Sequence, residues 1–246
     1  MSEGEERLLT WLEARQADYL HDLADLVAID SGTRDRAGVN RVVDWLAGRM
    51  ANLGATVERL PGHRHGDRLI GRWTGGAPGR VLLCGHADTV FPPGTAAARP
   101  FGPDPRDGNR LLGPGVCDMK AGLLAALYAM AALRAHEGET WGQVAMAVVG
   151  DEEVGSTESE PWLRELAPTF DAALVLEPAR ANGNLVTARK GGAFWRVAVL
   201  GRAAHAGVEP ERGASALVQL AHHVLDMEAL KDAVPGATLV PEETKT

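Results

Sequence analysis

Short apolar runs alternate with segments of helical periodicity along most of the chain, and this alternation is what most constrains the fold. Residues 80–85, 143–149 and 172–176 are apolar runs, and each is followed almost at once by polar side chains. Runs of about four to eight apolar residues are typical of buried strands. The segments between them repeat their apolar residues at roughly helical spacing. Strands that alternate with helices predict an α/β fold, with a mostly parallel sheet and helices on both of its faces.

The other elements follow from periodicity and from turn residues. One long helix is expected from Leu8 to Val27, and the next is expected to end before Gly54, a typical residue after a helix. This second helix covers residues 39–53. Further helices are expected at 119–133, 156–166 and 214–230, further strands at 55–60, 69–73 and 193–200, and a long surface loop at 91–110. The pattern changes after residue 188. We therefore expect a first domain over 1–188 and a partial α+β domain over 189–246.

The composition of the chain argues against some kinds of binding partner. The 246 residues carry 25 basic and 33 acidic side chains, a formal net charge of -8, which argues against nucleic acid and anionic membranes as partners. No apolar segment approaches the ~20 residues that a membrane span needs, and no signal-type apolar core follows the N-terminus. The expected location is cytoplasmic. The two cysteines, Cys84 and Cys117, are expected to be reduced, small apolar residues.

Potential metal ligands follow the apolar runs or lie in Gly/Pro turns. They are His86, Asp118, Glu152, Glu153 and Glu177, and Asp88 follows His86 by two residues, where a carboxylate usually orients a histidine ligand. One imidazole with several carboxylates is an oxygen-rich set that suits divalent cations, and ligands of parallel sheets gather beyond the carboxyl ends of the strands. Each residue also has a plainer interpretation. His86 could be a structural histidine, Asp118 a helix N-cap, and the acidic pair at 152–153 a solvated turn.

Taken together, these segments resemble a family of zinc peptidases. The family includes glutamate carboxypeptidases, aminoacylases, acetylornithine deacetylase and succinyl-diaminopimelate desuccinylase, and the carboxypeptidase branch is the most similar. The matching motifs, in the family's order, are HADTV at 86–90, GPGVCDMKAG at 113–122, DEEVGS at 151–156, EP at 177–178 and GRAAHAG at 201–207. The resemblance covers the chain from its first helix to about residue 230.

The resemblance implies two zinc ions and a role for each candidate residue. His86 and Glu177 would bind one zinc, Glu153 the second, and Asp118 would bridge both. Asp88 would orient His86. A separate carboxylate, that of Glu152, would act as general base on the attacking water. The peptide bond after Asp118 would be cis. The substrate would be a small peptide or an N-acyl amino acid, cleaved at an amide bond.

The resemblance also implies a lid or dimerisation domain in the second part of the chain. His205 would reach the active site of a partner subunit in a homodimer and help to stabilise an oxyanion. Relative to the family, the chain resembles a C-terminally truncated member, and the second zinc would lack its last histidine ligand. Two alternatives therefore stay open: a catalytically impaired fragment that only binds metal or dimerises, and a metal-free acid–base enzyme using the carboxylates at 151–153. The second alternative leaves His86 and Asp118 unexplained.

Overall fold

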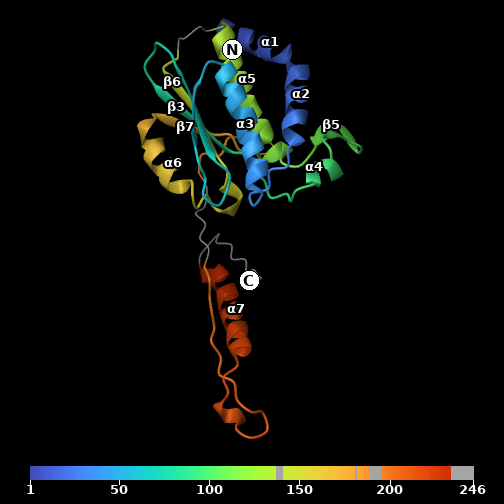
Figure 1. The fold of residues 1–246 in the computed structure, drawn as a ribbon, viewed down its shortest axis with the longest axis vertical. Coiled ribbons are helices and arrows are strands. Elements are labelled where there is room, and N and C mark those ends of the chain that lie inside the picture. The colour runs from blue at the N-terminus through green and yellow to red at the C-terminus, as the bar shows by residue number, and fades with distance from the viewer. Residues whose placement is uncertain (137–140, 181, 189–194, 234–246) are drawn as a thin grey trace. The chain divides into compact units, whose positions relative to one another are not determined.

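A computed structural model describes residues 1–136, 141–180, 182–188 and 195–233 of the chain (Figure 1). Its contacts divide the chain into two compact units, residues 1–186 and 187–246. The first unit contains the sheet and all the proposed metal ligands, from His86 to Glu177. The assignment of the two parts as a catalytic and a lid domain stays a prediction.

A five-stranded sheet forms the centre of the first unit, in the order β1-β2-β6-β3-β7. The strands are β1 (Thr56–Leu60), β2 (Arg68–Thr74), β3 (Arg80–His86), β6 (Gln143–Val149) and β7 (Ala172–Val175). Strand β3 is parallel to both β6 and β7, whereas β2 is antiparallel to both β1 and β6. The prediction of a mostly parallel sheet is therefore wrong, and the sheet is mixed. The connection from β1 to β2 is too short for the crossover that a parallel neighbour needs.

Helices cover both faces of this sheet, as predicted (Figure 1). One face packs against α2 (Gln16–Val27), α3 (Arg36–Asn52) and α5 (Ala121–His136). Their buried side chains meet alternate residues of the strands, among them Leu69 and Val148. The opposite face carries a smaller cluster around Ile70 and Leu82, which is covered by α6 (Glu160–Leu166) and by Phe170, the residue after the 3₁₀ turn η3 (Ala167–Thr169).

Two predicted segments differ from the structure. The single N-terminal helix is two helices, α1 (Glu3–Glu13) and α2, because the backbone leaves helical geometry at Arg15, where φ is -113° and ψ is 14°. The predicted loop at 91–110 contains a short helix, α4 (Thr95–Ala98), and a hairpin of β4 (Gly102–Asp104) and β5 (Asp107–Leu112). The Asp104 carboxylate accepts the Arg106 amide at 2.9 Å, so the polar residues that indicate a loop build the tight turn of this hairpin.

The second unit is described at residues 187–188 and from residue 195 to residue 233. It contains the 3₁₀ turn η4 (Pro210–Arg212) and helix α7 (Ala216–Ala233), which confirms the helix predicted at 214–230. The predicted strand at 193–200 is wrong for residues 195–200, which have no regular secondary structure, while residues 193–194 lie outside the described part. The backbone of Arg202 forms an isolated antiparallel bridge with Ala214 instead. The described residues therefore do not show an α+β lid.

One helical stretch is long and apolar enough to cross a membrane, although no segment was expected to be. The π-helical turn η1 (Val116–Lys120) and α5 together, Val116–His136, are long and apolar enough to cross a membrane by length and composition alone. The same stretch places Leu123, Leu127 and Met130 in the core of the first unit. Because core helices pass this test too, the stretch is weak evidence for a membrane span.

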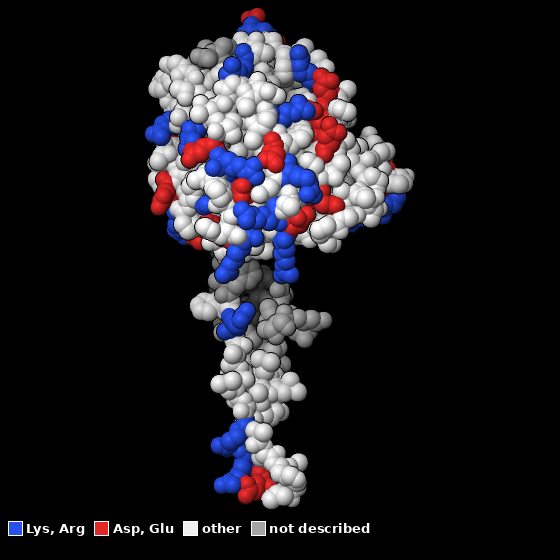
Figure 2. Space-filling model, viewed as in Figure 1, with Lys and Arg blue, Asp and Glu red and all other residues white. Residues whose placement is uncertain are grey.

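Charged residues of both signs are interspersed on the face of the first unit that Figure 2 shows. Arg59 pairs with Asp67 at 2.6 Å, Arg36 reaches the same carboxylate at 3.4 Å, and Arg72 pairs with Glu58 at 3.1 Å. The Asp67 carboxylate is buried, whereas the more exposed pair of Arg72 and Glu58 contributes little to stability. The expectation that nucleic acid is not a partner stays a prediction.

Candidate metal centre

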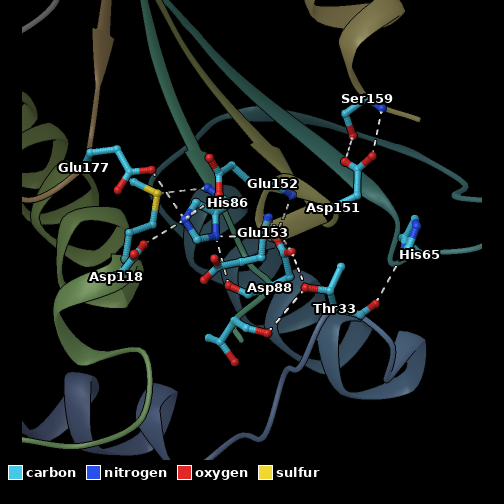
Figure 3. A network of polar contacts seen from close by, with 12 residues as sticks. Thr33, His65, His86, Asp88, Asp118, Asp151, Glu152, Glu153, Ser159 and Glu177 are labelled. Carbon is cyan, nitrogen blue, oxygen red and sulfur yellow. Dashed lines mark hydrogen bonds and ion pairs between the residues drawn. The ribbon is translucent and has the colours of Figure 1, made fainter. Parts of the chain in front are cut away.

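The three parallel strands bring the predicted ligands to one edge of the sheet (Figure 3). His86 is the last residue of β3 and lies opposite Val149, the last residue of β6. The chain then turns into the 3₁₀ turn η2 (Glu152–Val154), which carries the two adjacent glutamates. Strand β7 ends at Val175, two residues before Glu177. Parallel strands end at the same edge, so residues more than 60 positions apart become neighbours.

Asp118 reaches the same place from the turn before α5. Its peptide bond with Met119 is cis, as the resemblance implies. Gly115, with φ at +69°, lets the turn approach the segment after strand β3, because a Cβ there would lie 2.6 Å from Cγ2 of Thr89. The Met119 sulfur accepts the backbone N–H of His86 at 3.1 Å. The turn that carries Asp118 is thereby fixed against the end of β3.

One nitrogen of His86 faces the carboxylates. Its Nε2 lies 3.0 Å from Asp118 Oδ1, 3.5 Å from Glu177 Oε1 and 3.8 Å from Glu152 Oε2. Two groups of three side chains offer ligand atoms that all lie within 4.8 Å of one another: His86 with Asp118 and Glu153, and His86 with Glu152 and Glu177. The structure thus brings these five residues together, and the division of roles between Glu152 and Glu153 stays a prediction.

The other nitrogen of His86 faces Asp88 on the opposite side of the ring (Figure 3). His86 Nδ1 lies 2.9 Å from the main-chain oxygen of Asp88 and 3.4 Å from its Oδ1. A proton on Nδ1 satisfies either oxygen and leaves the Nε2 lone pair for a cation. The nearer acceptor is the main-chain oxygen, which was not part of the role predicted for Asp88. The orienting role of its carboxylate stays a prediction.

The electrostatics of the group favour positive charge. Burial alone would lower the pKa of His86, but the hydrogen bond with Asp88 and the surrounding carboxylates raise it to about 9. Burial raises the pKa of Glu153, and the charge of Asp118 adds to the shift. Burial also opposes the charge of Asp88, yet its hydrogen bonds with His86 and Thr33 and the charge of His86 lower its pKa. Carboxylates gathered at one edge repel each other unless a cation lies among them.

The donor set fits a zinc-like divalent cation. Zinc accepts imidazole nitrogen and carboxylate oxygen, and four such oxygen donors surround the single nitrogen here. The imidazole is buried, with 1% of its side chain exposed, whereas Asp118 and Glu152 are about half exposed, at 57% and 47%. A cation held by this set would therefore be fixed from the protein side and reachable from the solvent side.

Three residues support the centre through contacts that were not predicted from the sequence. The Asp151 carboxylate accepts the amides of Glu158 and Ser159, at 2.7 and 3.2 Å, and so closes the turn that carries the glutamates. The Lys120 ammonium donates to the main-chain oxygens of Leu26 and Ile29, at 3.1 and 2.6 Å. The third is Thr33, whose hydroxyl donates to Asp88. Only Asp151 stood out in the sequence, because it is the first of three adjacent acidic residues. The other two act through contacts with distant segments.

His205 belongs to the second unit. Its Nδ1 accepts the backbone N–H of Gly207 at 3.1 Å within an exposed turn. This contact orders the turn locally and does not test a function. The predicted role of His205 in substrate binding across a dimer stays a prediction.

Comparison with known proteins agrees with this geometry. A sequence model described as peptidase family M20/M25/M40 matches residues 82–244. The chain is 33% identical over 213 residues to carboxypeptidase G2 of Pseudomonas sp. (strain RS-16), covering 85% of this chain and 51% of the relative. It is 34% identical over 224 residues to succinyl-diaminopimelate desuccinylase of Rhodospirillum centenum, covering 82% and 56%. The chain thus spans about half the length of these relatives.

Solved structures show the same fold. A tripeptidase from Staphylococcus aureus aligns with a TM-score of 0.61 at 20% identity, covering 91% of this chain and 56% of the other. Human carnosine dipeptidase 1 aligns with a TM-score of 0.58 at 22% identity, covering 69% and 40%. At these identities the structures support the fold alone. The family match covers well over half of the chain and includes every residue of the metal centre. The chain therefore belongs to peptidase family M20/M25/M40.

Proposed function

We propose that this chain performs zinc-dependent hydrolysis of amide bonds. The substrate would be a small peptide that loses its C-terminal amino acid, or an N-acyl amino acid that loses its acyl group. The observation that carries the proposal is the set of one buried imidazole and four carboxylates at one edge of the sheet, in a chain of this peptidase family. The two curated relatives are named a carboxypeptidase and a desuccinylase, which supports an amide substrate without choosing between them.

Four side chains would bind the metal ions, and a fifth would orient one of the ligands. Family members typically bind zinc, and the His86 Nε2 and Glu177 would hold one ion, Glu153 the other, with Asp118 between them. When bound, the cations supply positive charge that polarises the scissile carbonyl and acidifies water. Asp88, on the far side of the imidazole, would keep the Nδ1 proton in place and the ring pointed at the cation.

Glu152 would move the proton. Its carboxylate lies 3.8 Å from the Nε2 of His86 and is 47% exposed, so it borders the space that a substrate would enter. It would take a proton from water as the water oxygen bonds to the carbonyl carbon. It would then deliver that proton to the amine nitrogen as the carbon–nitrogen bond breaks. One water is consumed, and one carboxylic acid and one amine are formed.

A direct test uses the purified chain loaded with zinc and a panel of dipeptides and N-acyl amino acids, with free amine as the readout. We expect zinc-dependent release of amine from at least one class. Glu152→Gln should lower turnover by about 10²- to 10⁴-fold and leave the zinc content unchanged, because glutamine cannot take the proton. Loss of zinc in Glu152→Gln would make Glu152 a ligand and reverse the roles of the two glutamates. Undiminished activity would move the base elsewhere, with Asp151 the next candidate.

A second candidate function is metal binding or dimerisation without turnover, in which Asp118 and Glu153 would still offer ligand atoms to a cation beside His86. About one zinc per chain with no amine release from any substrate would support this alternative. About two zincs with turnover would support the enzyme. Sedimentation of the chain with and without zinc would report whether it forms the proposed homodimer.

A further inference from the structure

One buried carboxylate links two parts of the metal centre. Asp88 is 1% exposed. Its Oδ1 accepts the backbone N–H of Glu152 and its Oδ2 that of Glu153, each at 3.2 Å. The same side chain lies 3.4 Å from His86 Nδ1. Any displacement of this carboxylate would therefore move the imidazole and the glutamate turn together.

The Asp88 carboxylate has one more partner, from a segment 55 positions earlier. Thr33 Oγ1 lies 2.7 Å from Asp88 Oδ2, and both residues are buried (Figure 3). The same hydroxyl lies 3.4 Å from the main-chain oxygen of Thr89. A hydroxyl has one proton, and the nearer, charged acceptor makes the stronger bond. The hydroxyl of Thr33 thus donates to the same carboxylate as the two backbone amides, and it shares the acceptor oxygen Oδ2 with the amide of Glu153.

The backbone around Thr33 is itself fixed to the segment that follows strand β3. Its N–H donates to the oxygen of Thr89 at 3.0 Å, and the N–H of Thr89 donates to Ser31 at 2.9 Å, which makes a parallel bridge. Gly32 allows this approach, because a Cβ there would lie 2.3 Å from the main-chain oxygen of Phe91. The hydroxyl is therefore held at a set distance from Asp88 by backbone contacts that do not depend on the carboxylate.

We infer that Thr33 is a positioning residue, which acts through Asp88 to fix both the His86 imidazole and the Glu152–Glu153 turn in the arrangement that binds metal. The inference rests on the proposed function, since it names a residue that prepares the same site. Without the hydroxyl, the Asp88 carboxylate keeps its two amide donors, which both come from the turn, and loses its only side-chain donor from outside the centre among the described residues. The turn and the carboxylate would then be free to shift together.

The test compares Thr33→Val, which replaces the hydroxyl with a methyl group of similar size, with Thr33→Ser, which keeps the hydroxyl. Ser31→Ala is the matched control, because Ser31 is 1% exposed, lies two residues away, and among the described residues its Oγ has no hydrogen-bond partner. The first readout is hydrogen exchange of the Glu152 and Glu153 amides in metal-free protein, followed by NMR. The second is the affinity for Co²⁺ and the visible absorption spectrum of the Co²⁺-loaded chain.

We expect Thr33→Val to speed exchange at both amides, to weaken Co²⁺ binding by about 10- to 100-fold, and to change the spectrum. Thr33→Ser should restore all three, and Ser31→Ala should match the wild type. A role in stability alone would lower the melting temperature of Thr33→Val without changing the spectrum or these two amides relative to others, and would overturn the inference. Equal effects of Thr33→Val and Thr33→Ser would overturn it as well.

Two further outcomes remain decisive. A wild-type chain that binds no Co²⁺ would contradict the proposed function, while the exchange of the Glu152 and Glu153 amides would still decide the role of Thr33. If Thr33→Val does not fold, Thr33→Ala removes the same hydroxyl with less bulk and is interpreted by the same comparisons.

Discussion

Gly122 lies in the first turn of α5, four residues after Asp118, and its replacement by alanine should separate two ligands of the metal centre. Alanine normally stabilises a helix relative to glycine by about 0.5–1 kcal/mol. Here an added Cβ would lie 2.0 Å from the main-chain oxygen of Leu176, the residue before Glu177. The atom it meets is backbone, which cannot rotate out of the way. The replacement of Gly122 by alanine should therefore lower the stability of the fold, where it would normally raise it.

The size of the effect follows from this contact. Carbon and oxygen atoms that are not bonded approach to about 3.3 Å, so α5 and the segment after β7 would have to move apart by roughly 1.3 Å. Metal sites hold their ligand distances to within about 0.2 Å. Asp118 and Glu177 could then no longer serve one cation arrangement. We expect zinc affinity to fall by at least about tenfold, and the free energy of unfolding to fall by about 1–3 kcal/mol through overpacking.

The assay is a competitive zinc titration together with urea unfolding of the metal-free chain. Gly48→Ala is the matched control, because Gly48 is exposed in the middle of α3 and a Cβ there would meet nothing within 4 Å. It should gain about 0.5–1 kcal/mol and bind zinc as the wild type does. A Gly122→Ala chain with wild-type zinc affinity and unchanged or higher stability would refute the close approach of α5 to Leu176.

Three shorter predictions concern proton binding, the turn and the core. Because the pKa of His86 is raised from 6.5 to about 9, protonation of His86 should stabilise the metal-free fold fully below about pH 6.5, and this contribution should be lost as pH rises to about 9. Zinc displaces that proton, so zinc titrations across this range should show affinity rising with pH, and a flat profile would contradict the shift. Asp151→Ala should lower the free energy of unfolding by about 0.5–2 kcal/mol in urea, since the start of α6 loses its acceptor, and an unchanged midpoint would count against that contact. Leu46→Ala, fully buried on α3, should cost about 2–5 kcal/mol in the same assay, and a cost below about 1 kcal/mol would place Leu46 outside the core.

The sequence predicted the part of the fold where local pattern and tertiary position agree. Strands β3, β6 and β7 are short apolar runs, so their composition reveals them even though the residues of β7 are exposed, and their carboxyl ends place His86 and Glu177 at one edge. The direction of β2 was not predictable in this way. An apolar run looks the same in a parallel and in an antiparallel neighbour, and only the pairing of β2 with β6 decides between them.

Other features of the structure could not be predicted from the sequence because they depend on tertiary contacts. Thr33 sits in a Ser-Gly-Thr segment that resembles any polar loop, and its contact with Asp88 joins residues 55 positions apart. Lys120 looks like a surface residue after a turn, yet it is 2% exposed and donates to two carbonyls near the end of α2. In the second unit, residues 195–200 have strand composition but no strand partner among the described residues, and composition alone cannot supply one.

The central claim is that a divalent cation binds between His86 and the carboxylates at the sheet edge. Anomalous diffraction at the zinc absorption edge, from crystals of the chain grown with zinc, tests it most directly. We expect a peak at about 2.0–2.2 Å from His86 Nε2, with oxygens of Asp118 and Glu177 at similar distances. A crystal that shows zinc only elsewhere, or His86 Nε2 still hydrogen-bonded to Asp118 with no peak beside it, would contradict the account.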